Sequence, residues 1–148
     1  MVSGSMTVLT AAGAPSPEMI KTLDARVRKL FTYVHDKHGA DLWTSYASNV
    51  KLNKPFYGDC DDLASTTLDM ISQLGYPKTC MARGLVSSKK NSLVDHMIAY
   101  CMDNLGKVWV VGDTFGPAYP ISRMQHQQLE YSPVTTGISW SKGKIPGT

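Results

Sequence analysis

Two short apolar runs, at residues 97–102 and 108–111, flank a stretch of turn-forming residues, Asp103-Asn104-Leu105-Gly106. Apolar runs of this length on either side of a turn predict a β-hairpin. A hairpin constrains the fold strongly, because the length of its turn sets which residues face each other across the strands. With the turn centred in the middle of this stretch, Cys101 pairs with Val108.

The same register places His96 directly opposite Asp113. Opposed residues share one face of the sheet, with Cβ atoms about 4.5–5.5 Å apart. The carboxylate of Asp113 could then accept the imidazole N–H of His96 and hold the ring in one tautomer. A turn of odd length would make the pair diagonal, which is still within reach. The hairpin therefore predicts a histidine base and an acid that orients it.

Cys60 lies within the sequence Gly58-Asp59-Cys60-Asp61-Asp62, just before a helical pattern. Apolar positions then recur at intervals of four, three and four residues, which predicts a helix with one apolar stripe that begins near Cys60 and ends at Gly75; the stripe consists of Leu63, Thr67, Met70 and Leu74. The N–H groups and dipole at a helix N-terminus favour the thiolate, which is the attacking species. We therefore interpret Cys60 as a nucleophile.

The aspartates around Cys60 oppose this activation. Negative charge on Asp59, Asp61 and Asp62 should raise the pKa of the thiol. Two arrangements would compensate: a protonated His96 that pairs with the thiolate, or a bound cation that neutralises some of the carboxylates. The sequence leaves both open.

Other residues of these types have simpler interpretations. Cys80 and Cys101 each lie in an apolar, strand-like run, so we expect them to be small buried core residues. His126 stands between glutamines, which predicts a solvated side chain. The cysteines do not follow a C-x-x-C spacing, which argues against a zinc knuckle or a disulfide scaffold.

The chain of 148 residues is 43% hydrophobic, which is enough for one globular domain with its own core. Residues 1–5 look like a cloning remnant, and we expect residues 1–15 to be a tag or disordered and residues 16–148 to form the single domain. Ser16 and Pro17 predict the start of a helix that ends at Gly39; its apolar face consists of Met19, Leu23, Val27, Leu30, Phe31 and Val34.

Residues 40–57 mix aromatic and polar side chains and are predicted to form a loop beside a cleft. Strands are predicted at residues 79–86 and, as one or two strands, within residues 127–140. The backbone N–H of Cys60 is the expected first donor to an oxyanion. A second donor should come from the loop, where the candidates are Trp43, Asn49 and Asn53.

The formal charge of +3 is small and spread along the chain, so nucleic acid is not an expected partner. No apolar run has the length of a membrane span, and the N-terminus shows no secretory signal. We therefore expect a cytoplasmic or virion-associated protein, or a periplasmic one if a signal has been removed.

Four segments resemble successive blocks of the bacterial transglutaminase-like cysteine peptidases, whose best-known members are the LapG-type periplasmic proteases. They are GDCDDLA at residues 58–64, LGYP at 74–77, DHMIAY at 95–100 and WVVGDT at 109–114. The resemblance implies a papain-like α+β fold, with N-terminal helices packed on a small antiparallel sheet. It also implies roles for the three candidates: Cys60 attacks a peptide carbonyl, His96 is general base and then acid, and Asp113 orients His96.

In this family calcium binds acidic residues that flank the cysteine, which correspond to Asp59 and Asp61. Calcium prefers hard carboxylate oxygens and would remove their effect on the thiolate. The simpler interpretation is that these aspartates only cap the helix. The sequence departs from the family at Asp61, where glutamate is usual, and at Thr114, where asparagine is usual.

These observations predict a cysteine peptidase of bacteriophage or bacterial origin that acts on a protein or peptide. One alternative is acyl transfer on another amide. The enzyme would then cleave a peptidoglycan cross-link, or pass the acyl group to an amine as transglutaminases do. Another is a non-catalytic module that binds a partner when calcium is present. A complete set of nucleophile, base and acid speaks against a module that only binds.

Overall fold

The computed structural model describes residues 8–35 and 44–147. Its α-helices are α1 (Pro17–Leu30), α2 (Ala47–Lys51) and α3 (Cys60–Gln73). Its strands are β1 (Phe31–Tyr33), β2 (Phe56–Gly58), β3 (Met81–Ser87), β4 (His96–Met102), β5 (Val108–Val111), β6 (Tyr119–Pro120), β7 (Gln127–Pro133) and β8 (Ser141–Lys142). Short 3₁₀ helices occupy Lys78–Cys80, Ile121–Arg123 and Val134–Thr136.

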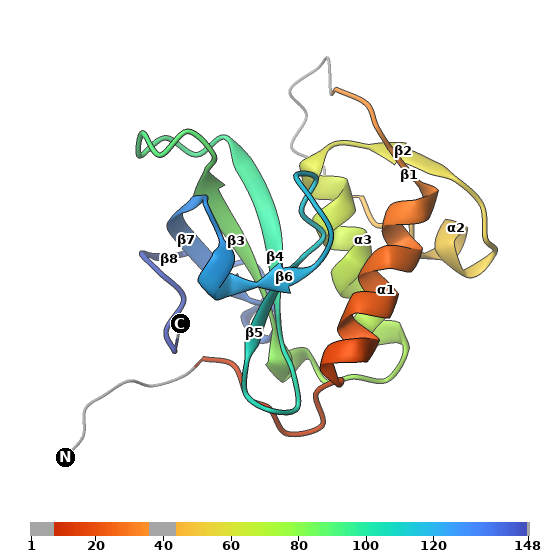
Figure 1. Ribbon diagram of the computed structural model, residues 1–148, viewed down its shortest axis with the longest axis horizontal. Coiled ribbons are helices and arrows are strands. Elements are labelled where there is room, and N and C mark those ends of the chain that lie inside the picture. Colours follow the sequence, from red (N-terminus) through yellow and green to blue (C-terminus); the bar gives the residue numbers. More distant parts are fainter. Residues whose placement is uncertain (1–7, 36–43, 148) are drawn as a thin grey trace.

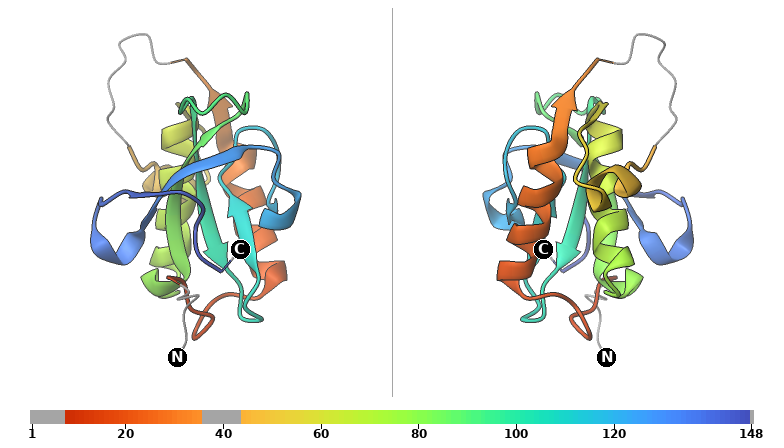
Figure 2. Two further views of the ribbon diagram at one scale, coloured as in Figure 1. Left: turned by 90° about the vertical axis from the view of Figure 1, so that its left-hand side faces the viewer. Right: turned by 90° about the vertical axis from the view of Figure 1, so that its right-hand side faces the viewer.

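The main sheet is antiparallel and has the strand order β6-β5-β4-β3-β7-β8. Helices α1 and α3 lie together on one side of this sheet (Figures 1 and 2). The main core lies between the helices and the sheet and includes Ile20, Leu68, Ile71, Ile98 and Val110, all buried. The predicted α+β, papain-like arrangement of helices on an antiparallel sheet is confirmed. None of the described helices is long and apolar enough to cross a membrane.

Helix α3 follows its sequence pattern closely. It begins at Cys60 and buries Leu63, Thr67 and Met70. Leu74 lies just after its last turn and is 50% exposed, and Gly75 follows with a φ of +96°. Glycine accepts this left-handed backbone without strain, so the helix ends where the sequence predicts.

Helix α1 begins as predicted, because the Ser16 hydroxyl accepts a hydrogen bond from the backbone N–H of Met19 at 3.1 Å. The predicted end at Gly39 is wrong, since the helix stops at Leu30 and β1 continues the chain. β1 pairs in parallel with β2, where Phe31 lies opposite Phe56 with ring centroids 5.5 Å apart. Aromatic residues favour strands, and pairing with a distant segment outweighs the local helical pattern. Gly39 itself lies outside the described residues.

The packed part of the chain begins earlier than the predicted boundary at residue 16. Leu9 is 2% exposed and belongs to the main core, and the backbone N–H of Thr10 donates to the Thr79 carbonyl at 3.0 Å. The N-terminal segment therefore covers the end of the sheet near β3. The prediction for residues 1–7 falls outside the described residues.

Two other predictions need correction. The segment at 40–57, predicted to be a loop, contains α2 and β2 in its described part, and Phe56 is buried in a small second core. The strand predicted at 79–86 starts at Met81, after a 3₁₀ turn. Within residues 127–140, β7 is present as predicted and pairs with β3, while β8 comes after this range.

The predicted hairpin is present as β4 and β5, but its register differs by one residue. Met102, not Cys101, pairs with Val108. The buried Asp103 organises a longer turn: its Oδ1 accepts the N–H groups of Leu105 at 2.8 Å and Lys107 at 2.9 Å. Its Oδ2 accepts the indole N–H of Trp109 at 2.8 Å. This side chain stabilises the turn of odd length that shifts the register.

Candidate active site

His96 and Asp113 form a buried pair although the register does not place them opposite each other. His96 Nε2 lies 2.7 Å from Asp113 Oδ1, and the two side chains are 5% and 1% exposed. The diagonal contact expected for a turn of odd length is wrong, because in a regular ladder a shift of one residue turns the two side chains to opposite faces. Asp113 escapes this constraint because it lies beyond the end of β5, after Gly112.

Gly112 breaks the alternation of the strand. Its φ is +61°, a left-handed conformation that turns the chain before Asp113. A Cβ at this position would lie 2.9 Å from the Cα of Ala64, because the backbone packs closely on α3. The N–H of Gly112 donates to Oδ1 of the buried Asp24 at 2.8 Å, which fixes the turn to α1. The glycine thus allows the contact with His96.

Asp113 is surrounded by donors. Besides His96, the backbone N–H of Phe115 donates to Oδ1 at 3.0 Å, and the Tyr119 hydroxyl donates to Oδ2 at 2.7 Å. Burial by itself raises the pKa of Asp113, but hydrogen bonds from His126, His96, Phe115 and Tyr119 outweigh burial and bring the pKa far below the usual range. Asp113 is therefore a carboxylate, and His96 must donate through Nε2–H.

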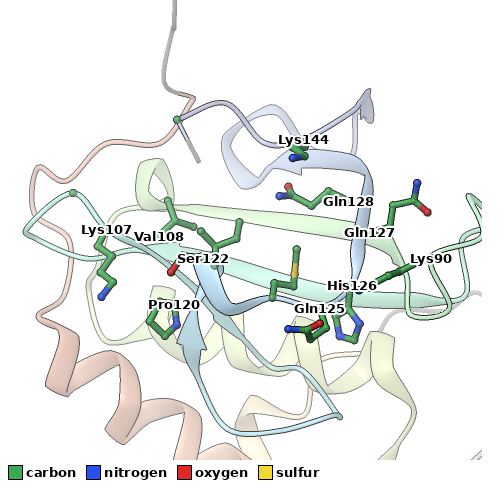
Figure 3. Close-up of a pocket in the computed structure, with 14 residues that line it drawn as sticks. Lys90, Lys107, Val108, Pro120, Ser122, Gln125, His126, Gln127, Gln128 and Lys144 are labelled. Atoms are coloured by element: carbon green, nitrogen blue, oxygen red, sulfur yellow. The ribbon is translucent and has the colours of Figure 1, made fainter.

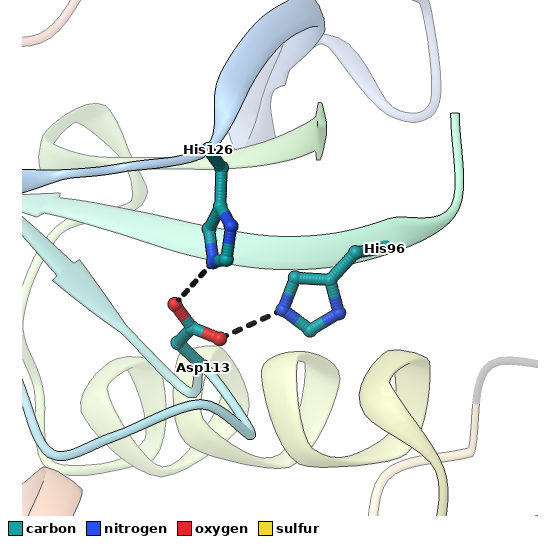
Figure 4. A group of neighbouring side chains, drawn as sticks. All are labelled: His96, Asp113 and His126. Carbon is teal, nitrogen blue, oxygen red and sulfur yellow. Dashed lines mark hydrogen bonds and ion pairs between the residues drawn. The ribbon is translucent and has the colours of Figure 1, made fainter. Parts of the chain in front are cut away.

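His126 is the site residue that sequence reasoning missed. Its Nε2 lies 2.9 Å from Asp113 Oδ2, and its side chain is 6% exposed (Figure 4). The prediction of a solvated side chain is therefore wrong. Its neighbours Gln125 and Gln127 give no sequence signal of burial, because the position of His126 depends on how the segment before β7 folds back toward Asp113.

Cys60 is the first residue of α3, and its side chain is half-buried. Its Sγ lies 3.4 Å from Asp61 Oδ1 and also faces the backbone N–H of Met97, the residue after His96. The structure thus brings Cys60 to the same end of the sheet as His96 and Asp113. Burial, and then the charges of Asp61 and Asp59, raise the pKa of the thiol to about 12. The hydrogen bond from the backbone N–H of Met97 lowers the pKa, but by less. The thiol needs compensation before it can ionise at neutral pH.

Of Asp59 and Asp61, the two aspartates for which helix capping was the simpler interpretation, Asp59 does cap α3, and its partner in the capping box is Asp62. Asp59 Oδ1 accepts the N–H groups of Asp61 at 3.1 Å and Asp62 at 3.4 Å. Asp62 Oδ2 accepts the N–H of Asp59 at 3.1 Å, which completes a capping box. Both bonds to Asp59 use the same oxygen, so capping occupies only one side of this carboxylate.

Comparison with solved structures shows what this fold is similar to. No protein-family model and no curated protein sequence matches the chain. Among solved structures, calcium-bound LapG of Legionella pneumophila matches with a TM-score of 0.62 and 16% identity, over 93% of this chain and 75% of that one. A second LapG structure matches with a TM-score of 0.64 and 15% identity, over 88% and 71% of the two chains. The chain has the fold of LapG.

The EGTA-treated form of LapG matches as well, with a TM-score of 0.59 and 15% identity, over 90% of this chain and 75% of that one. At this level of identity the likeness to LapG shows a common fold. It agrees with the family that the blocks around Cys60, His96 and Asp113 resemble. The chemistry of this chain has to be argued from its own residues.

The acidic residues beside Cys60 fit a calcium ion in their donor chemistry. Asp59 and Asp61 offer hard carboxylate oxygens on both sides of the cysteine, and their charges raise the pKa of its thiol. A divalent cation would relieve this excess of negative charge. LapG has been solved both calcium-bound and EGTA-treated.

The second oxyanion donor stays a prediction. The side-chain amide of Asn49 donates to the Pro55 carbonyl at 3.2 Å and so supports the turn between α2 and β2. Asn53 is exposed and has a φ of +55°, which places it in that same turn. Trp43 lies outside the described residues.

A groove of about 970 Å³ lies next to this site (Figure 3). Its lining includes Lys90, Lys107 and Lys144 at its borders, and His126, which also contacts Asp113. Neither Cys60 nor His96 lines it. The groove therefore reaches the candidate site from the side of His126.

Proposed function

We propose that this protein is a cysteine peptidase, with Cys60 as nucleophile, His96 as general base and acid, and Asp113 as the residue that orients His96. The observation that carries the proposal is the buried 2.7 Å contact between His96 and Asp113 at the end of the sheet where Met97 faces the thiol of Cys60. If His96 had only a structural role, it would need neither a carboxylate partner nor a nearby cysteine at a helix N-terminus.

The geometry supports a two-step reaction. Because Nε2 of His96 carries the proton donated to Asp113, Nδ1 is the nitrogen that can take the thiol proton. The thiolate attacks the peptide carbonyl, and the imidazolium gives its proton to the departing amine as the C–N bond breaks. Water, deprotonated by His96, then hydrolyses the thioester and returns the free thiol. Asp113 stays ionised throughout and stabilises the imidazolium.

Calcium dependence is the second part of the proposal. Asp59 and Asp61 would hold the ion, and when bound it would lower the pKa of the Cys60 thiol by neutralising their charge. The supporting observations are the raised pKa of this thiol and the calcium-bound form of LapG. Expected substrates are proteins or peptides, including peptides of a cell wall.

The direct test is digestion of casein by the purified chain with calcium or with EGTA. We expect cleavage by the parent protein and none by Cys60→Ser, since a hydroxyl in this acidic setting is far harder to ionise than a thiol. Cys101→Ser, which alters a buried thiol away from the site, is the control for a general effect of the substitution. Cleavage by the Cys60→Ser protein would remove the nucleophile from the proposal.

The same samples separate the related chemistries. Clearing of cell-wall zymograms without casein cleavage would indicate a peptidoglycan amide hydrolase. Incorporation of a labelled amine into casein would indicate acyl transfer. Calcium binding without any turnover would indicate a binding module.

A further inference from the structure

Three rings pack against one another above Asp113. The imidazoles of His96 and His126 meet edge to face with centroids 5.0 Å apart. The ring of Phe115 contacts each of them at a centroid distance of 4.8 Å. Phe115 is 67% exposed, whereas the two histidine side chains are nearly buried. Phe115 thus separates the histidines from solvent, and packing holds both rings in place.

The two oxygens of Asp113 have different partners. Oδ1 accepts hydrogen bonds from His96 Nε2 at 2.7 Å and from the Phe115 N–H at 3.0 Å. Oδ2 accepts hydrogen bonds from the Tyr119 hydroxyl at 2.7 Å and from His126 Nε2 at 2.9 Å. The terminal torsion of an aspartate is soft, so donors on Oδ2 are needed to stop the carboxylate from turning away from His96.

The neighbouring strands hold His126 in position. The next residue, Gln127, pairs with Ser87 at the start of β7, and its Oε1 accepts the N–H of Ser92 at 2.9 Å. Tyr119 lies on β6 and pairs with Val110 of β5. His126 and Tyr119 are therefore fixed by different strands and converge on one oxygen.

A metal ion shared by these residues fits the distances less well than hydrogen bonds do. Within the described residues, ligand atoms of His96, Asp113 and His126 lie within 4.8 Å of one another. Two ligands of a tetrahedral zinc ion with bonds of about 2.0–2.1 Å lie roughly 3.3 Å apart. The observed N···O distances of 2.7 and 2.9 Å are shorter and typical of charge-assisted hydrogen bonds.

We propose that His126 is a positioning residue: with Tyr119 it fixes the Asp113 carboxylate, so that Oδ1 is held in line with Nε2 of His96. This inference rests on the proposed function, because it assigns His126 to the same site. It adds a fourth side chain to the set of Cys60, His96 and Asp113.

The remaining charged and titratable groups around this cluster leave the arrangement intact. Arg28 of α1 donates to the backbone carbonyl of Asp113 at 2.7 Å and is also paired with Asp24. Burial and the bond to Asp113 raise the pKa of Tyr119, so its hydroxyl remains a donor. Tyr100 of β4 and Asp95, the residue before His96, also interact electrostatically with this cluster.

The test compares His126→Phe with His126→Gln. Phenylalanine keeps an aromatic ring between Phe115 and His96 but has no donor, whereas the glutamine amide can place an N–H near the same point. We expect kcat of His126→Phe to fall on the order of 10- to 100-fold with KM nearly unchanged, because loss of orientation misplaces the base. His126→Gln should restore most of this loss. Gln73→Ala, which alters an exposed glutamine at the end of α3 and outside the groove, is the control.

A second measurement does not depend on peptidase activity. In ¹⁵N-labelled protein, the Nε2–H proton of His96 should give a downfield, slowly exchanging signal that broadens in His126→Phe and returns in His126→Gln. If this pattern appears without any substrate cleavage, the positioning role stands and the proposed function fails. Wild-type kcat together with an unchanged His96 signal in His126→Phe would overturn the positioning role.

Tyr119→Phe provides a test if the His126→Phe protein does not fold. It removes only the hydroxyl donor to Oδ2. We expect it to weaken the His96 signal in the same direction. An unchanged His96 signal in Tyr119→Phe would show that this hydroxyl does not help to fix the carboxylate, and would overturn the role proposed for His126 and Tyr119 together.

Discussion

At the scale of single residues, Asp113 accepts hydrogen bonds from four groups, two on each oxygen of its carboxylate. The local sequence predicts only one of them. His96 is found because it begins the same hairpin, whereas His126 and Tyr119 reach Asp113 through the arrangement of β6 and β7. Their side chains could not be predicted from the sequence, because no local periodicity links them to Asp113.

Asp113→Asn should reduce activity strongly. The asparagine side chain has an NH₂ donor on one side and a carbonyl acceptor on the other. Its NH₂ group would therefore face either His96 or the pair of His126 and Tyr119, all of which donate to the carboxylate in the parent protein. Disturbing the His96 tautomer should lower kcat on the order of 10²- to 10⁴-fold. Rates near the wild-type value in a folded Asp113→Asn protein would contradict the role of Asp113.

The same variant has a signature in acid stability. The fold brings the pKa of Asp113 below its usual range, so this carboxylate stabilises the protein fully above about pH 4 and loses that contribution as the pH falls. The free energy of unfolding, measured with urea, should therefore fall more steeply with decreasing pH for the parent protein than for Asp113→Asn. Equal slopes for both proteins would show that Asp113 is not stabilised as an ion.

At the scale of elements, α3 was predictable because its signals are local. The cap at Asp59, the apolar stripe and the stop at Gly75 all lie within a few residues of the helix. The end of α1 and the register of the hairpin were not predictable in this way. The first depends on Phe31 pairing with Phe56, and the second on Asp103 binding Lys107 and Trp109 across the turn.

Variants of Asp59 separate capping from calcium binding. Asp59→Ala should lose about 1 kcal/mol of unfolding free energy in EGTA, because the helix loses its cap. Asp59→Asn keeps an acceptor and should remain close to the parent protein in EGTA. With calcium, the parent should gain stability by mass action, and both variants should gain less.

Urea titrations with calcium and with EGTA measure both effects. Glu18→Gln, which removes a carboxylate from the first turn of α1, is the control for loss of negative charge. A calcium gain in Asp59→Asn as large as in the parent would remove Asp59 from the calcium site, while leaving its cap in place.

At the scale of the whole molecule, the candidate site joins segments that are far apart in the sequence. Cys60 comes from α3, His96 from β4, Asp113 from the turn after β5, and His126 from the segment before β7. The order of Cys60, His96 and Asp113 along the chain could be recognised from sequence blocks. The contribution of residues 8–15 to the core could not, because most of these residues are small and give no strong signal of an element.

The central claim is that Cys60 is a nucleophile that becomes reactive once the negative charge around it is compensated, and the rate of its alkylation by iodoacetamide tests that claim most directly. In EGTA, the pKa of about 12 that burial, Asp61 and Asp59 impose on the thiol predicts slow labelling that keeps rising up to about pH 9. With calcium, labelling at neutral pH should be faster and level off at lower pH. In both conditions Cys60 should react before the buried Cys80 and Cys101.

Mass spectrometry of the labelled peptides identifies the reacting cysteine. Fast labelling of Cys60 that does not depend on calcium would assign its activation to a protonated His96 in place of the ion. Labelling of Cys60 no faster than that of Cys80 and Cys101, with calcium as well as with EGTA, would contradict the account and leave the likeness to LapG as one of fold alone.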